Sequence, residues 1–194
     1  MSEPDSAHHL TIPNLITLIR ILLTPLFIIF LIQKRYPQAF AVFLAAGISD
    51  LLDGLVARMW RQRSPLGIIL DPLADKLLMS ASFVTLGIMR LIPGWLTVVV
   101  LSRDLILMVG VLVFRLVDYP LVIRPSLAGK LTTTLQITVV LLVLMGKTWS
   151  MPGPVLPLIF WAAGGLTVIS GLHYILRALA QVAQAEAAPE KDDG

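Results

Sequence analysis

Six apolar runs, each about as long as a bilayer-spanning helix, restrict this 194-residue chain more than any other feature. A hydrocarbon core about 30 Å thick is crossed by roughly 20 helical residues. The breaks between the runs are rich in Pro, Gly and charged residues, which is typical of turns between helices. The sequence therefore predicts six membrane-spanning helices, over residues 15–32, 40–59, 67–89, 95–114, 127–145 and 156–179.

Composition supports the same fold class, an all-α integral membrane protein built as a six-transmembrane-helix bundle. The chain is 57% hydrophobic and 14% charged, whereas soluble domains are about 45–50% apolar and about 25% charged. The absence of cysteine excludes disulfides, zinc–thiolate sites and a cysteine nucleophile. A net charge of +3 from scattered basic residues gives no support for nucleic-acid binding. We expect one membrane domain over residues 12–180, with polar tails at 1–11 and 181–194.

The basic residues near the predicted helix ends are unevenly shared between the two sides of the membrane. Lys and Arg are enriched in cytoplasmic loops, so the richer side is expected to be cytoplasmic. This predicts a multi-pass protein of the cell (inner) membrane, with both termini in the cytoplasm. The richer side holds Arg58, Arg61, Arg63, Arg115, Arg124, Lys130, Arg177 and Lys191, and the other side holds Lys34, Arg35, Arg90 and Lys147.

Five acidic residues lie inside the apolar runs, where a carboxylate costs a few kcal/mol and is a functional candidate by default. They are Asp50, Asp53, Asp71, Asp75 and Asp104. Spacings of three and four residues place the first pair on one helix face and the second pair on another. Because a short connection makes the two helices antiparallel neighbours, the four carboxylates are expected to converge just below the cytoplasmic surface.

Four carboxylates so close together repel one another unless cations neutralise them. Oxygen-only ligands suit Mg²⁺ or Mn²⁺, and two such ions can clamp a diphosphate. Gly54 and Gly67 favour this interpretation, because a missing side chain lets a large substrate approach the backbone. Buried salt bridges are the structural alternative, with Arg58, Lys76, Arg20 and Arg103 as partners.

The acids belong to a longer motif, Asp50-x2-Asp53-Gly54-x2-Ala57-Arg58-x8-Gly67-x3-Asp71-x3-Asp75. It resembles the signature of the CDP-alcohol phosphatidyltransferases at all eight fixed positions, and the six-span layout is similar as well. The resemblance implies a homodimeric enzyme with two divalent ions per active site. Such an enzyme displaces CMP from CDP-diacylglycerol with the hydroxyl of a second, glycerol-type alcohol, in the membrane and on its cytoplasmic side.

The resemblance also implies roles for individual residues. Asp50, Asp53, Asp71 and Asp75 would be the metal ligands, and Asp75 would also be the general base that accepts the proton of the incoming hydroxyl. The CDP-diacylglycerol site would comprise Asp50, Asp53, Gly54, Ala57, Arg58, Gly67, Asn14 and Thr17.

Further stretches resemble phosphatidylglycerophosphate synthases, whose acceptor is glycerol 3-phosphate. They are Ile12 to Arg20, Asp71 to Lys76, and Gly129-Lys130-x2-Thr133-x2-Gln136. This resemblance implies that Arg103, Lys130 and Arg124 hold the acceptor phosphate. Asp104, Thr132 and Pro125 look more like the CMP-forming cardiolipin synthases, which use phosphatidylglycerol. Glycerol 3-phosphate is the first expectation and phosphatidylglycerol the alternative.

Each secondary candidate also has a structural interpretation. Adjacent helical residues point about 100° apart, so Asp104 is expected to point away from Arg103, and it could neutralise Arg20 or Lys76 instead. Lys130 could simply extend to the lipid headgroups. The small residues Gly164, Gly165 and Gly171 could line a dimer interface or pack within one chain.

A small cation transporter is the alternative of a different class, since acids inside a membrane also mark ion pathways. The predicted acids lie near one surface rather than at the midplane, and no inverted repeat is visible in the six runs. Both features favour the enzyme.

Overall fold

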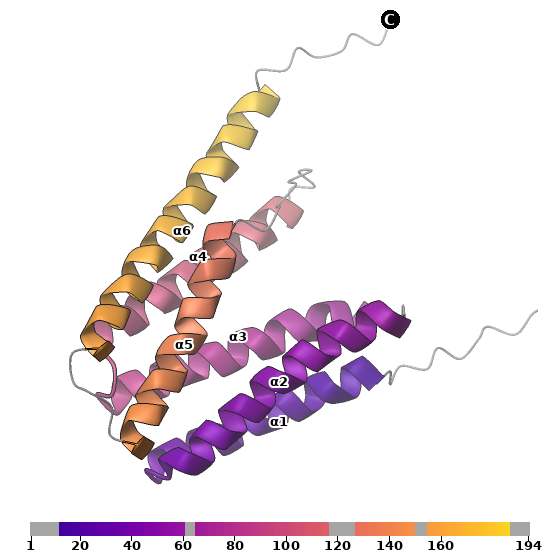
Figure 1. Cartoon of the computed structure of the whole chain (residues 1–194). Helices are drawn as coiled ribbons and strands as arrows, with labels where there is room; N and C mark the ends of the chain where they lie inside the picture. Colours follow the sequence, from indigo (N-terminus) through magenta and orange to yellow (C-terminus); the bar gives the residue numbers. More distant parts are fainter. Residues whose placement is uncertain (1–11, 61–64, 117–126, 150–154, 187–194) are drawn as a thin grey trace, which may run out of the picture. The chain divides into compact units, whose positions relative to one another are not determined.

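The computed structural model describes residues 12–60, 65–116, 127–149 and 155–186, which form six helices and the turns between them. Figure 1 shows their course. Each helix covers one of the predicted apolar runs, and no strand occurs in these residues. The prediction of an all-α fold is confirmed. The helices are α1 Ile12–Ile32, α2 Tyr36–Trp60, α3 Pro65–Ile88, α4 Gly94–Leu116, α5 Leu127–Trp149 and α6 Val155–Glu186.

Three of the helices contain described stretches that are long and apolar enough to cross a membrane. These stretches are Gly94–Phe114, Leu127–Trp149 and Val155–Gln181. In the first three helices, the apolar stretches with described side chains are shorter than these, and they are Thr17–Ile32, Tyr36–Ser49 and Lys76–Ile88. The long apolar helices indicate a membrane protein.

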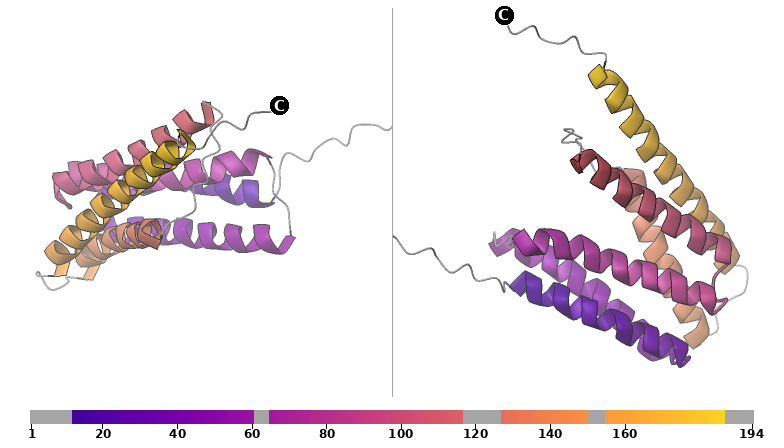
Figure 2. Two further views of the ribbon diagram at one scale, coloured as in Figure 1. Left: turned by 90° about the horizontal axis from the view of Figure 1, so that it is seen from above. Right: turned by 180° about the vertical axis from the view of Figure 1, so that it is seen from behind.

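The chain divides into two compact units. The first unit comprises Met1–Leu91 and Val140–Pro152, and the second comprises Ile92–Val139 and Gly153–Gly194. In the first unit, α1 packs against both α2 and α3 (Figure 2). The second unit contains α4, the first half of α5 and α6, and its α4 packs against α6.

The buried face of α1 changes character along the helix. Residues at spacings of three and four share one helix face, and this face carries Thr17, Arg20, Thr24, Phe27 and Leu31, all buried. The second half of this face is apolar, and the ring centroids of Phe27 and of Phe43 on α2 are 5.5 Å apart. Its first half is polar. The polar half lies at the end of the first unit where the predicted acids of α2 and α3 are located.

Helices α1 and α3 end in the same type of cap. Backbone N–H groups of Lys34 and Arg35 donate to the carbonyls of Leu31 and Phe30 at 2.8 and 2.9 Å, which is the Schellman pattern. The same pattern of hydrogen bonds caps α3, and there Arg90 is the residue whose backbone has the left-handed conformation. Lys34 and Arg90 both have φ of 57°. Glycine is favoured there, because a side chain costs about 1–2 kcal/mol in the left-handed region.

The second unit depends on a close contact between α4 and α6. The rings of Trp95 and Trp161 stack with their centroids 4.6 Å apart. A Cβ atom added at Gly164 would overlap the ring of Trp95, and one added at Gly171 would lie 3.5 Å from Cγ of Arg103. Gly164 therefore serves close packing within the chain, whereas the distance at Gly171 is an ordinary van der Waals contact. Gly165 has no neighbouring atom within 4 Å of such a Cβ.

Replacing Gly164 by Ala should destabilise the second unit, because the new methyl group must displace an indole that is stacked on a second indole. Overpacking of this kind typically costs about 1–3 kcal/mol. Gly165→Ala is the matched control and should be neutral or slightly stabilising, since Ala is the better helix former. Unfolding of the purified variants in detergent measures both effects, and equal stability of the two variants would contradict the proposed contact.

Candidate functional site

The four acids of the motif lie in two helices of the first unit. Asp50 and Asp53 are in α2, and Asp71 and Asp75 are in α3. Continuous helix at these positions confirms the periodicity on which the shared faces depend. Their side chains are outside the described residues, so the carboxylate cluster and its metal ions remain predictions.

The remaining predicted CDP-diacylglycerol residues are also helical, with one side chain described. Thr17 is fully buried on α1, and its role in binding stays a prediction. Asn14, Gly54, Ala57, Arg58 and Gly67 lie in α1, α2 and α3, and their side chains are not among the described ones. Arg124, predicted to hold the acceptor, falls wholly outside the described residues.

Arg20 is a candidate that the sequence analysis named only as a salt-bridge partner. Its side chain is 1% exposed on the polar half of the α1 face, one helical turn from Thr17. A buried guanidinium is costly unless an anion accompanies it. The signal was available in the sequence, because Arg20 interrupts an apolar run three residues after a predicted binding residue.

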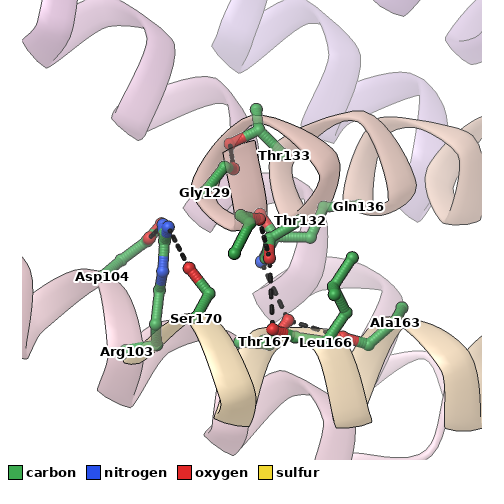
Figure 3. Close-up of polar contacts among 11 residues, drawn as sticks. Arg103, Asp104, Gly129, Thr132, Thr133, Gln136, Ala163, Leu166, Thr167 and Ser170 are labelled. Carbon is green, nitrogen blue, oxygen red and sulfur yellow. Dashed lines mark hydrogen bonds and ion pairs between the residues drawn. The ribbon is translucent and has the colours of Figure 1, made fainter. Parts of the chain in front are cut away.

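Arg103 on α4 forms a buried ion pair with its neighbour in sequence (Figure 3). Its Nη1 donates to Oδ1 of Asp104 at 2.8 Å, and its Nη2 donates to Oγ of Ser170 on α6 at 3.2 Å. The side chains of Arg103 and Asp104 are 9% and 8% exposed. The prediction that Asp104 points away from Arg103 is wrong. The Cβ directions of adjacent residues diverge, but the long arginine side chain brings its guanidinium back to the carboxylate.

The ion pair changes what Arg103 can offer to a ligand. Asp104 neutralises its charge, and Ser170 holds a second edge of the guanidinium. Nε of Arg103 is buried and has no hydrogen-bond partner among the described residues. A buried donor without a partner carries a desolvation cost of about 1–3 kcal/mol. The N–H group at Nε is therefore left for one further hydrogen bond.

The stretch from Gly129 to Gln136 serves two different purposes. Gln136 donates from Nε2 to Oγ1 of Thr167 on α6 at 3.3 Å. The Thr132 hydroxyl shares its proton between the carbonyl of Ala128 at 2.8 Å and the carbonyl of Leu166 on α6 at 3.2 Å. Thr132 and Gln136 are buried, so both hold α5 against α6. Lys130 is exposed near the start of α5.

Comparisons with known proteins identify one family for this chain. A family model described as CDP-alcohol phosphatidyltransferase matches residues 10–170. Cardiolipin synthase (CMP-forming) of Homo sapiens is 33% identical over 179 residues, which cover 84% of this chain and 60% of the human protein. The probable phosphatidylglycerophosphate synthase of Mycobacterium tuberculosis (strain ATCC 25618 / H37Rv) is 34% identical over 179 residues, covering 87% of this chain and 82% of that protein.

A third relative has a similar degree of identity. The CDP-diacylglycerol--glycerol-3-phosphate 3-phosphatidyltransferase of Bacillus subtilis (strain 168) is 34% identical over 182 residues, covering 84% of this chain and 92% of that protein. The chain spans 57–60% of the length of the three animal cardiolipin synthases it matches. Identities of 33% and 34% do not separate the two acceptor types.

Asp104→Asn should destabilise the protein by about 3 kcal/mol, because removing one partner of a buried ion pair leaves the other charge uncompensated. Ser170→Ala should cost about 1 kcal/mol, the usual net value of one hydrogen bond. Unfolding in mixed micelles measures both changes. The double variant Arg103→Gln with Asp104→Asn should recover part of the loss, and strictly additive effects of the two substitutions would show that the pair contributes nothing.

Proposed function

Because the chain belongs to the CDP-alcohol phosphatidyltransferase family, we propose that it transfers the phosphatidyl group of CDP-diacylglycerol to glycerol 3-phosphate. The products are CMP and phosphatidylglycerophosphate, in a step of phospholipid biosynthesis. The observation that carries the proposal is the motif from Asp50 to Asp75, whose eight fixed positions include four aspartates. It lies inside the region matched by the family model. A cation transporter finds no support in the comparisons.

In the proposed reaction, the acceptor hydroxyl attacks the phosphorus that carries the diacylglycerol. A new P–O bond forms, the bridging P–O bond to CMP breaks, and CMP leaves with the bridging oxygen. Asp75 accepts the proton of the hydroxyl. The chain supplies four carboxylates on helical faces of α2 and α3, an oxygen-only ligand set that fits Mg²⁺ or Mn²⁺. Two such ions, when bound, neutralise the diphosphate and the departing oxygen.

The polar half of the α1 face supports this assignment. A substrate diphosphate needs cations or hydrogen-bond donors beside the metal ligands. Buried Thr17 and Arg20 supply both types of group on a helix that packs against α2 and α3. We propose that Arg20 acts with Arg58 to balance the charge of the acids and the diphosphate.

The proposal includes the arrangement in the membrane and the assembly. Residues 12–180 would form one catalytic membrane domain with six spans, and the protein would be a homodimer. Both termini and the metal site would lie on the cytoplasmic side of the inner membrane, which is supported by the distribution of Lys and Arg.

CMP release from CDP-diacylglycerol should require an added divalent cation and stop on chelation. Asp75→Asn should lower kcat by a factor of about 100 to 10,000, the usual contribution of a general base. Binding of CDP-diacylglycerol should be retained, because removing a general base chiefly lowers kcat. Asp53→Asn is the comparison variant and should weaken substrate binding as well. Turnover after exhaustive chelation, or a kcat for Asp75→Asn within tenfold of wild type, would refute this mechanism.

A second acceptor is favoured by one specific observation. Asp104 neutralises Arg103, and a neutralised guanidinium suits a phosphodiester with one negative charge better than a phosphomonoester with two. Phosphatidylglycerol carries such a phosphodiester, and using it would make the protein a CMP-forming cardiolipin synthase. The human relative bears that name.

A panel of acceptors with the purified protein decides between the two. If glycerol 3-phosphate is the acceptor, Lys130→Gln and Arg103→Gln should each raise its KM about ten- to a hundredfold, since a charge-assisted contact is worth about 1.5–3 kcal/mol. KM for CDP-diacylglycerol should change little. Ser170→Ala, which leaves the cation in place, is the control. Formation of cardiolipin from phosphatidylglycerol, with no reaction of glycerol 3-phosphate, would establish the alternative.

A further inference from the structure

Four exposed basic residues gather at one end of the first unit, opposite to the end of α2 and α3 that carries the predicted metal ligands. We call this set the basic end. Lys34 and Arg35 link α1 to α2, Arg90 follows α3, and Lys147 lies in the last turn of α5. All four side chains are exposed.

The contacts of the helices place these residues at a common end. The rings of Phe40 and Trp149 meet edge to face with centroids 5.6 Å apart, which brings the end of α5 to the start of α2. Helix α3 packs against α1 and runs in the same direction, so Arg90 follows α3 where Lys34 follows α1 (Figure 1).

The basic end has no compensating negative charge. The sequence contains no Asp or Glu over residues 14–49, 76–91 and 140–152, which make up this part of the unit. None of the four cations forms an ion pair within the described residues. Four positive charges without partners form a site for an anion.

Two of the cations occupy positions that favour glycine. Lys34 and Arg90 have φ of 57° at the helix caps, and glycine would adopt this conformation without strain. Attraction to the helix dipole does not explain the choice, because a basic residue in the last helical turn provides it without strain. The last turns of α1 and α3 contain no such residue. Lys34 and Arg90 instead place their charges just beyond the last turns of α1 and α3.

The surroundings identify the anion as a lipid headgroup. Trp149, which ends the same helical turn as Lys147, is 61% exposed, and exposed tryptophans mark the level of the headgroups in membrane proteins. The length of α2 from Tyr36 to Asp50 separates the basic end from the first predicted metal ligand by about 20 Å. A lipid at the basic end is therefore remote from the proposed catalytic site.

We propose that the basic end binds the phosphate-bearing headgroup of an anionic phospholipid, in the leaflet opposite the predicted metal site. The proposal does not depend on the acceptor alcohol or on catalysis.

The double variant Lys34→Gly with Arg90→Gly provides the test, because it removes two charges and the strain of both caps together. The full chain is placed in phosphatidylcholine nanodiscs with chelator, with or without a minor fraction of phosphatidic acid. In phosphatidylcholine alone, the variant should have the same Tm as wild type or a higher one. Phosphatidic acid should raise the Tm of wild type only. Its affinity for the variant should fall about 25-fold, from about fivefold for each basic residue near a membrane surface.

Three controls make the result decisive. Lys34→Arg with Arg90→Lys retains the charges and should bind the lipid like wild type. Arg177→Gln removes an exposed cation of the second unit and should change nothing. Arg35→Gln with Lys147→Gln leaves both caps intact and should weaken binding to a similar extent, which covers the case of a glycine variant that does not fold.

Two outcomes would overturn the proposal. Unchanged lipid affinity in both double-neutral variants would mean that the cations serve only the chain itself. Equal stabilisation by inorganic phosphate would identify a free anion rather than a lipid. The leaflet is tested separately: an Arg35→Cys variant, in a chain without other cysteines, should react with an impermeant thiol reagent added outside intact cells. Labelling only after lysis would refute the assignment to the outer leaflet.

Discussion

Charge inside an apolar helix must be neutralised within the protein, and this requirement determines which helix faces turn inward. Arg20, Arg103, Asp104 and Gln136 are buried, whereas Leu112 and many other large apolar side chains are exposed. A lipid environment produces this arrangement, because hydrocarbon solvates an exposed leucine but not an exposed guanidinium. Polar and charged side chains are thus buried together with apolar ones, and Thr17 and Arg20, which we propose for substrate binding, are among them.

The helices could be predicted from the sequence because a single property, the length of an uninterrupted apolar run, sets them. The pairing of Arg103 with Asp104 could not be predicted in the same way. Backbone geometry separates the two Cβ atoms, and the outcome depends on the conformation of a long side chain and on Ser170 from another helix. Likewise, spacing could not show whether Gly164 faces a partner subunit or Trp95.

The candidate site contains residues that could be predicted from the sequence and residues that could not. The motif from Asp50 to Asp75 could be recognised from the sequence because its residues stand at fixed spacings, and α2 and α3 are helical at these positions. Arg20 was undervalued because its burial follows from the packing of α1 on two helices. The left-handed conformations of Lys34 and Arg90 left no signal, since glycine, the residue that normally announces them, is absent there.

The adjacency of Arg103 and Asp104 has a consequence for how the protein is made. An ion pair between two helices forms only after both helices have entered the bilayer and met. A pair within one turn of a single helix can form as soon as that turn does. The apolar stretch Gly94–Phe114 of α4 can therefore enter the membrane as an electrically neutral segment, without the insertion penalty of about 2.5–3.5 kcal/mol for each isolated charge. Its insertion need not wait for α6, which supplies only Ser170 afterwards.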